Sequence, residues 1–423
     1  MSSLEVSMAM HSKGRIGAAV ACSCGLHGRF TAAARVLALM PHRHNPVAAS
    51  MTQTLSPSHR RVGVVSSAQT EWRDAWSGAQ HIDLISAAVQ QALEGSGLRI
   101  EDVDFIIDSG SDVLDGRSIS NCGFLGAMGA HHKEESRVED DGLWAALYGV
   151  TKIASGAADV GLIIAYAKPS EADVQQFHTS IADPFCQRPV GLDEATAQGL
   201  LAQAYLHRYH LEDDALAEVA SRSWARALRN PHLRLSRAPD RAEVAASPWV
   251  AAPLRQGMLA RPVDGAVAMV LGSERVARRA ARTPIWVTGM GASMDSGNFA
   301  MREPGFAACA TAARAAFAAA GTDARSIGLA EISATSAAAE LITLEALGLA
   351  EGGRAIDLYR DDSTLELNRS GGALPAWPVF ATGLVRLAEA ASQMADGLGN
   401  GKGVVHASSG LGGQSHCVFV VEA

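Results

Sequence analysis

Short apolar runs alternate with longer amphipathic runs along most of this chain, and the whole alternation occurs twice. Apolar runs at 61–67, 102–110 and 159–167 predict strands, and the segments between them carry apolar residues at the three- and four-residue spacing typical of helices. The same order resumes at Pro284 with a strand predicted at 284–293. A repeat of this kind predicts a duplicated α/β fold, in which two mixed sheets pack around shared central helices.

The repeat divides the chain into a leader and two halves. The first fifty residues carry five basic residues against the single acid Glu5, which is typical of a targeting peptide. Since Met51 offers a second start, we set residues 1–55 aside as a targeting segment or an upstream extension, and we expect them to be disordered. Residues 56–280 then form the first half, with an Arg-rich loop domain at about 186–261, and residues 281–423 form the second half.

Composition excludes several classes of protein. The net charge of −8 argues against a nucleic-acid-binding protein, because such proteins usually display a basic surface. No apolar run approaches the roughly 18 residues of a membrane span, so we expect a cytoplasmic protein that binds no membrane. The six cysteines lack the spacing of zinc sites or disulfide frameworks, so we expect no metal and place Cys309 and Cys417 in the core.

Four stretches of the sequence resemble the thiolase superfamily, and most closely its sterol-carrier-type and archaeal-like branch. They are "SPWVAAPLRQGMLARPVDGAVAMVLGSERVA", "AEISATSAAAELITLEALGL", "LNRSGGALPAWPVFATGLVRLAEAA" and "SSGLGGQSHCVFVVE". The resemblance extends over about residues 60–423. It implies the duplicated thiolase fold, five layers in the order αβαβα, usually as a homodimer that binds acyl-CoA and holds no tightly bound cofactor.

The resemblance also implies a catalytic set that this chain lacks. Family members use a Cys nucleophile at a helix N-terminus, a second Cys in a C-terminal Gly-rich loop, a His in a "GHP" motif and a His or Asn in the second-half turn. Other residues stand at all four places here: Asp140 and Asp141 at the nucleophile, Ser333 and Thr335 in the turn, Trp377 in the His motif and Ser409 in the C-terminal loop. The usual covalent chemistry through a thiolate is therefore not expected.

The replacing residues have structural as well as functional interpretations. Asp140 and Asp141 stand at a predicted helix start, where carboxylates cap free N–H groups, or one of them acts as a general base in the acyl pocket. Ser333 and Thr335 are turn residues, or their hydroxyls hold a thioester carbonyl. Trp377 can donate a hydrogen bond but cannot accept a proton, which favours packing.

Two further sets of residues are candidates for binding or proton transfer. His406 precedes the C-terminal loop and has the side chain that proteins use most often to move protons. Arg222, Arg226 and Arg229 begin an Arg-rich region at 222–261, which suits the phosphates of a coenzyme A thioester. The alternative is a solvated, charged surface.

Three functions remain open at this point. The first is an atypical acyltransferase or carbon–carbon bond-forming or -cleaving subunit of an acyl-CoA (lipid, steroid or aromatic) catabolic complex, paired with a small OB-fold, zinc-ribbon protein. The second is a non-catalytic, thiolase-like scaffold subunit. The third, an ordinary acetyl-CoA acetyltransferase, conflicts with the missing Cys and His residues.

Overall fold

The computed structural model describes residues 60–280, 282–360 and 363–423. The leader expected at 1–55 lies outside these residues. None of the described helices is long and apolar enough to cross a membrane.

The strands show that the repeat in the sequence is a repeat in the fold. The first half contributes β1 Val62–Gln69, β2 Phe105–Ser109, β3 Glu134–Val138, β4 Val160–Ala167 and β7 Gly265–Ser273. The second half contributes β8 Ile285–Met294, β9 Leu329–Ile332, β10 Glu366–Leu367, β11 Lys402–Ser409 and β12 Ser415–Glu422. Within each half the strands lie in the order third, second, fourth, fifth, first, and only the fifth is antiparallel to its neighbours. The duplicated α/β fold is thereby confirmed.

The two halves are joined more directly than the sequence predicts. Residues 62–64 of β1 pair antiparallel with residues 285–287 of β8, so ten strands form one continuous hydrogen-bonded sheet. The two mixed sheets expected from the sequence are therefore joined at this seam. The physical reason is that both first strands lie at the inner edge of their half, where each has backbone groups left to pair.

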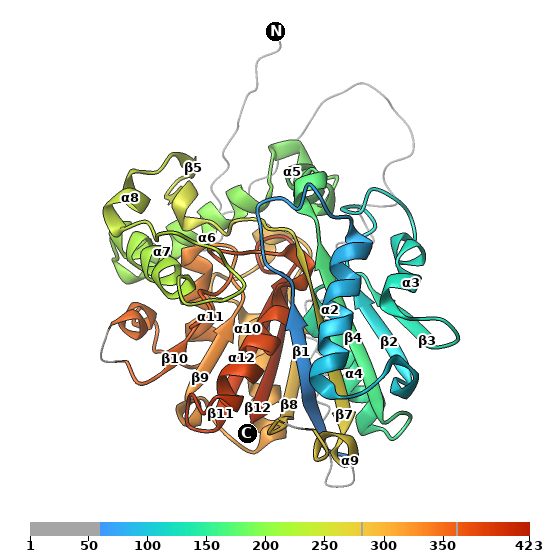
Figure 1. Cartoon of the computed structure of the whole chain (residues 1–423). Coiled ribbons are helices and arrows are strands. Elements are labelled where there is room, and N and C mark those ends of the chain that lie inside the picture. The colour runs from blue at the N-terminus through green and yellow to red at the C-terminus, as the bar shows by residue number, and fades with distance from the viewer. Residues whose placement is uncertain (1–59, 281, 361–362) are drawn as a thin grey trace, which may run out of the picture. The chain divides into compact units, whose positions relative to one another are not determined.

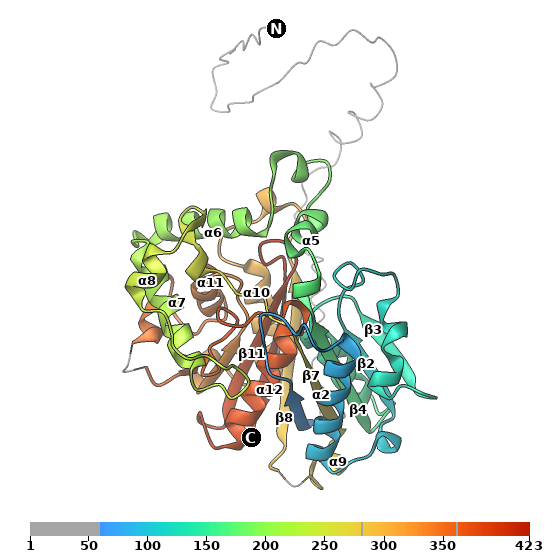
Figure 2. The ribbon, with the colours of Figure 1, turned by 45° about the horizontal axis from the view of Figure 1, so that its top comes forward.

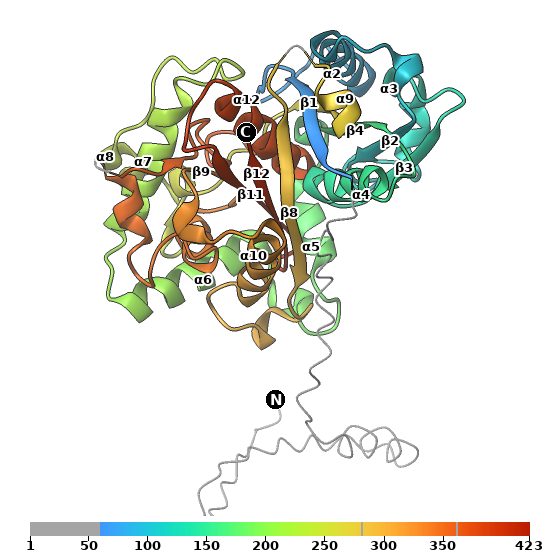
Figure 3. The ribbon, with the colours of Figure 1, turned by 90° about the horizontal axis from the view of Figure 1, so that it is seen from below.

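Helices cover both faces of each half-sheet. They are α2 His81–Ser96, α3 Leu125–Met128, α4 Gly142–Ala154, α9 Glu274–Ala277, α10 Ala307–Ala320, α11 Ala337–Ala346 and α12 Thr382–Ala395. The helices α4 and α12 pack together in the central core, whereas α2 and α10 pack in the two outer cores. Figure 3 shows α10 and α12 on opposite faces of the strands β8, β11 and β12. Along β2, Phe105 and Ile107 enter the central core and Ile106 an outer one, as the two-residue period of a strand requires.

A long insertion connects β4 to β7. It contains α5 Val174–Ile181, α6 Glu194–Tyr209, α7 Asp214–Ala227, α8 Arg241–Ala246, β5 Trp249–Ala251 and β6 Leu254–Arg255. It therefore begins directly after β4, earlier than the loop domain expected at 186–261. The insertion is coloured green to yellow in Figure 1, and in Figure 2 α5 and α6 lie above the strands.

Candidate active site

A cavity of about 320 Å³ lies where the insertion meets strand ends from both halves. Residues from the loop after β3, from α5, from the loop before α12 and from the β11–β12 turn line it. Five of the residues singled out in the sequence meet there: Asp140, Asp141, Thr335, Trp377 and Ser409. Because they come from segments up to 269 residues apart in sequence, only the duplicated fold brings them together.

Asp140 and Ser409 form the polar centre of this cavity. Both residues line the cavity, and the Ser409 hydroxyl hydrogen-bonds to the Asp140 carboxylate. Burial raises the pKa of Asp140, while that hydrogen bond and a second one, from the backbone N–H of Asp141 at 2.7 Å, lower it. A carboxylate held in this way near an apolar cavity is suited to accept a proton.

Asp141 differs from its neighbour because its carboxylate holds the backbone. One oxygen accepts the N–H of Leu143 at 2.8 Å and the other accepts the N–H of Gly383 at 2.8 Å. Asp141 therefore caps α4 and ties it to the first turn of α12. Burial raises its pKa to about 8, against the lowering effect of the two N–H donors. This geometry favours the capping interpretation for Asp141 and leaves Asp140 as the candidate base.

The second-half turn supplies less to the cavity than the sequence suggested. The Thr335 hydroxyl donates to the buried carboxylate of Glu194 at 2.9 Å, and the same carboxylate accepts the N–H of Gly412 at 2.7 Å. Glu194 thus fixes the turn to the C-terminal loop. Ser333 and His406 do not line the cavity: both are buried behind it, and burial holds the pKa of His406 well below its usual value.

His178 on α5 is a cavity residue that sequence reasoning missed. Its ring stacks on Trp377 with a centroid distance of 5.6 Å and an interplanar angle of 16°. Burial lowers the pKa of His178, so its imidazole is neutral at pH 7. A neutral imidazole therefore stands beside Trp377 in the wall of the cavity. No local motif marks His178, because its role depends on how the insertion folds over the strands.

Apolar side chains form most of the remaining wall: Phe177, Ile181, Val379, Phe380 and Leu411. Val379 has a φ of 41°, which is strained for a β-branched residue. Strain of this kind collects at functional sites, where the surrounding structure over-determines the backbone.

None of the four cysteines in the described part of the chain lines this cavity. Cys122 and Cys186 are exposed, while Cys309 and Cys417 are fully buried, as expected for core residues. Burial raises the pKa of both buried thiols, which keeps them protonated. The described cavity therefore holds no thiolate nucleophile.

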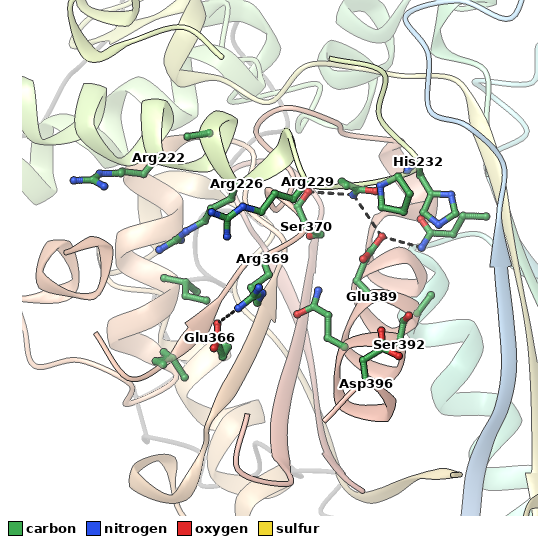
Figure 4. Close-up of a pocket in the computed structure, with 18 of the residues that line it drawn as sticks. Arg222, Arg226, Arg229, His232, Glu366, Arg369, Ser370, Glu389, Ser392 and Asp396 are labelled. Atoms are coloured by element: carbon green, nitrogen blue, oxygen red, sulfur yellow. Dashed lines mark hydrogen bonds and ion pairs between the residues drawn. The ribbon is translucent and has the colours of Figure 1, made fainter. Parts of the chain in front are cut away.

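The three predicted arginines line a different and larger cavity, of about 800 Å³ (Figure 4). Arg222, Arg226 and Arg229 lie on or just after α7, and Arg360 and Arg369 face them from the second half. Arg222 pairs with Glu218 at 2.7 Å. No lining residue is common to this arginine-lined cavity and the cavity of Asp140.

Buried polar groups form the floor of the arginine-lined cavity. Glu389 of α12 accepts hydrogen bonds from Gln69 at 3.0 Å and from Asn230 at 3.5 Å. Burial, followed by the charge of Glu331, raises the pKa of Glu389. The acidic floor and basic rim together suit a ligand whose phosphates stay at the rim.

The geometry agrees with comparisons to known proteins. The family model described as "Thiolase C-terminal domain-like" matches residues 291–422. An acetyl-CoA acetyltransferase of Methanothermobacter thermautotrophicus is 26% identical over 378 residues, which cover 84% of this chain and 97% of that protein.

Solved structures share the fold at lower sequence identity. An Ltp2–ChsH2(DUF35) aldolase superposes with a TM-score of 0.73 at 21% identity, over 87% of this chain and 98% of that one. Human mitochondrial 3-ketoacyl-CoA thiolase superposes with a TM-score of 0.67 at 16% identity, and the match covers 88% of this chain and 99% of that one. A monomeric SCP2-thiolase-like protein of Mycobacterium smegmatis superposes with a TM-score of 0.66 at 19% identity, and the match covers 87% of this chain and 77% of that one.

Proposed function

Because the chain belongs to the thiolase superfamily, we propose that it binds acyl-CoA thioesters and makes or breaks a carbon–carbon bond in them by acid–base catalysis, without a covalent acyl-enzyme. The observation that carries the proposal is the Asp140–Ser409 pair, which lies inside a cavity that no described Cys lines. An acyl-aspartate would be an anhydride, so Asp140 is suited to proton transfer and not to carrying the acyl group.

A retro-aldol cleavage of a β-hydroxyacyl thioester fits these groups. The Asp140 carboxylate accepts the proton of the β-hydroxyl, the bond between the α- and β-carbons breaks, and a carbonyl compound leaves. The electron pair of that bond forms the enolate of the shortened thioester, and the proton that Asp140 accepted is returned to its α-carbon, which restores the carboxylate. His178 lies in the same cavity, where its neutral imidazole can hydrogen-bond the enolate oxygen.

We place the phosphates of coenzyme A at Arg222, Arg226 and Arg229, and this assignment can be tested apart from the chemistry. Calorimetry with acyl-CoA and with the matching acyl-pantetheine, which lacks the nucleotide, separates the two cavities. Replacing the three arginines by alanine should weaken acyl-CoA binding and leave acyl-pantetheine unchanged. Equal weakening of both ligands, or of neither, would show that the phosphates bind elsewhere.

Turnover tests the chemistry itself. The full chain is incubated with a panel of β-hydroxyacyl-CoAs, and the shortened thioester and the released carbonyl compound are measured by mass spectrometry. Asp140→Asn should abolish product, while Cys122→Ser and Cys186→Ser should not change its rate. Product that persists in Asp140→Asn, or an acyl adduct on the protein, would refute the acid–base mechanism.

The same assay separates the enzyme from a scaffold subunit. One similar structure is described as an Ltp2–ChsH2(DUF35) aldolase, and on that likeness we propose a small OB-fold, zinc-ribbon partner for this chain. We also propose that the chain forms a homodimer. The assay is therefore repeated with candidate partners added. If the chain binds acyl-CoA but forms no product, either alone or with any candidate partner, the result would favour the non-catalytic scaffold subunit over the enzyme.

A further inference from the structure

A cysteine and two histidines meet in the outer core of the second half, behind the cavity of Asp140. They are Cys309 on α10, His406 on β11 and His416 on β12, and each is completely buried. One ligand atom from each lies within 4.8 Å of the others, and the two imidazoles approach to 3.0 Å between His406 Nε2 and His416 Nδ1. We call these three residues the CHH cluster.

Local sequence explains why the three side chains converge. His406 and His416 lie on neighbouring strands, and both side chains face the outer core. The helix α10 approaches that face closely because it is rich in alanine and crosses β8 at Gly289 and Gly291. A Cβ added at either glycine would lie about 2 Å from an α10 carbonyl oxygen, so only glycine permits this approach. The cluster is thus built by the packing of the core.

The two imidazoles by themselves leave one hydrogen-bonding defect. The Nε2 of His416 faces the Gly413 carbonyl at 2.9 Å, so it carries the hydrogen and its Nδ1 presents a lone pair. The Nδ1 of His406 makes no hydrogen bond within the described chain. If the hydrogen of His406 is on Nε2, the buried Nδ1 lacks a donor. If the hydrogen is on Nδ1, two lone pairs face each other at 3.0 Å.

A metal ion between the two facing nitrogens removes the repulsion of the second arrangement. A ring N–H donated to a backbone carbonyl, as His416 donates to Gly413, is the usual support of a metal-bound histidine. Bonds of roughly 2.0–2.3 Å would hold the three ligand atoms about 3.5 Å apart in a trigonal arrangement. The observed separations, from 3.0 Å up to at most 4.8 Å, reach that geometry by small side-chain rotations.

The geometry points to a binding site for a monovalent soft metal ion, Cu(I), held by Cys309, His406 and His416. Thiolate sulfur selects soft ions, and two histidines with one cysteine form a trigonal set typical of copper. Binding replaces the thiol proton, so one H⁺ is released for each ion bound. The resulting unit of Cu⁺, one thiolate and two neutral imidazoles has no net charge.

Charge balance is what favours a monovalent over a divalent ion. The CHH cluster contains no carboxylate, so Zn²⁺ would leave one uncompensated positive charge in an apolar core, which is costly. The guanidinium of Arg302 adds a further positive charge nearby.

A cavity approaches the cluster on the side of the C-terminal loop. A cavity of about 300 Å³ is lined by Phe306 and by Gly412 and Gly413. The ring of Phe306 contacts His416 at a centroid distance of 4.9 Å. Phe306 therefore borders both this cavity and the cluster.

The test is a Cu(I) titration of the full chain under argon, against a chromogenic Cu(I) chelator. Four other thiols would also bind copper: two lie in the leader and two are exposed. All measurements therefore use a background variant in which Cys22, Cys24, Cys122 and Cys186 are replaced by serine. One equivalent of Cu(I) should bind with release of one proton, and X-ray absorption should show one sulfur and two nitrogen ligands. Zn²⁺ should not bind at this site.

Two further variants locate the ion. Cys309→Ser in this background should lose the bound equivalent, whereas Cys417→Ser should keep it, because Cys417 is equally buried but faces the central core. If Cys309→Ser fails to fold, His406→Gln serves instead. A folded background variant that binds no Cu(I), or binding that survives Cys309→Ser, would overturn the proposal. Loss of Cu(I) binding would not affect the acyl-CoA assignment, since the two sites are measured separately.

Discussion

The contact between the N-termini of α4 and α12 gives the sharpest prediction of stability. A Cβ added at Gly383 would lie 2.0 Å from Asp141 Oδ1, 2.6 Å from the Cβ of Ala407 and 2.8 Å from the Cβ of Leu143. These neighbours belong to the buried core and cannot move independently. Gly383→Ala therefore displaces the carboxylate that caps both helices.

The magnitude follows from three contributions. Overpacking a core costs about 1–3 kcal/mol, and a buried donor left without its acceptor costs about 1–3 kcal/mol. Alanine is favoured over glycine in a helix by about 1 kcal/mol. The sum is a loss of roughly 1–5 kcal/mol in the free energy of unfolding.

Gly95→Ala is the matched control. Gly95 lies inside α2, where an added Cβ meets only Ser66 at 3.5 Å, an ordinary contact. This variant should gain about 0.5–1 kcal/mol. Denaturant unfolding followed by circular dichroism measures both variants. Equal shifts of the two midpoints, or an unchanged midpoint for Gly383→Ala, would refute the account of this helix contact.

Three further predictions concern the cavity and the core. Ser409→Ala removes a hydrogen bond that lowers the pKa of Asp140, so the pKa of this base should rise. The acidic limb of the pH–rate profile, where the base becomes protonated, should therefore move to higher pH. A limb that does not move would show that Asp140 is not the group that titrates there. His178→Phe retains the stack on Trp377, and it should lower kcat while the Kd for acyl-CoA stays within about twofold; a loss of binding alone would assign His178 to substrate binding. Arg386→Met leaves Glu331, paired with it at 2.7 Å, as an unpaired buried charge, and unfolding should show a loss of about 3–5 kcal/mol. The double variant Arg386→Met/Glu331→Leu should recover most of that loss, and equal instability of both variants would contradict the argument.

The fold could be predicted because its signal is local. Continuous apolar runs such as 160–167 identify buried strands, and their repetition after Pro284 identifies the duplication. The pairing of β1 with β8 could not be predicted, because it depends on which edges the two halves leave open. The charged strand β3, Glu134–Val138, lacks the alternation that marks a strand and was also missed.

The site was predictable only where sequence motifs mark it. Asp140 and Ser409 occupy motif positions, and the structure brings them into one cavity. Ser333, in the turn after β9, and His406 were also singled out, but both are buried in the core; for His406 the two-residue period of β11 turns the side chain inward. His178 reaches the cavity through the fold of the insertion, which no motif in the sequence encodes.

Calorimetric titration of the full chain with acyl-CoA tests the central claim most directly. The account predicts binding in the micromolar range that Ser409→Phe abolishes, because the larger ring fills the cavity of about 320 Å³ beside Asp140. The unfolding midpoint of Ser409→Phe provides the check that the variant is folded. Binding that is unchanged in folded Ser409→Phe, or no heat from the folded wild-type chain with any thioester, would contradict the claim.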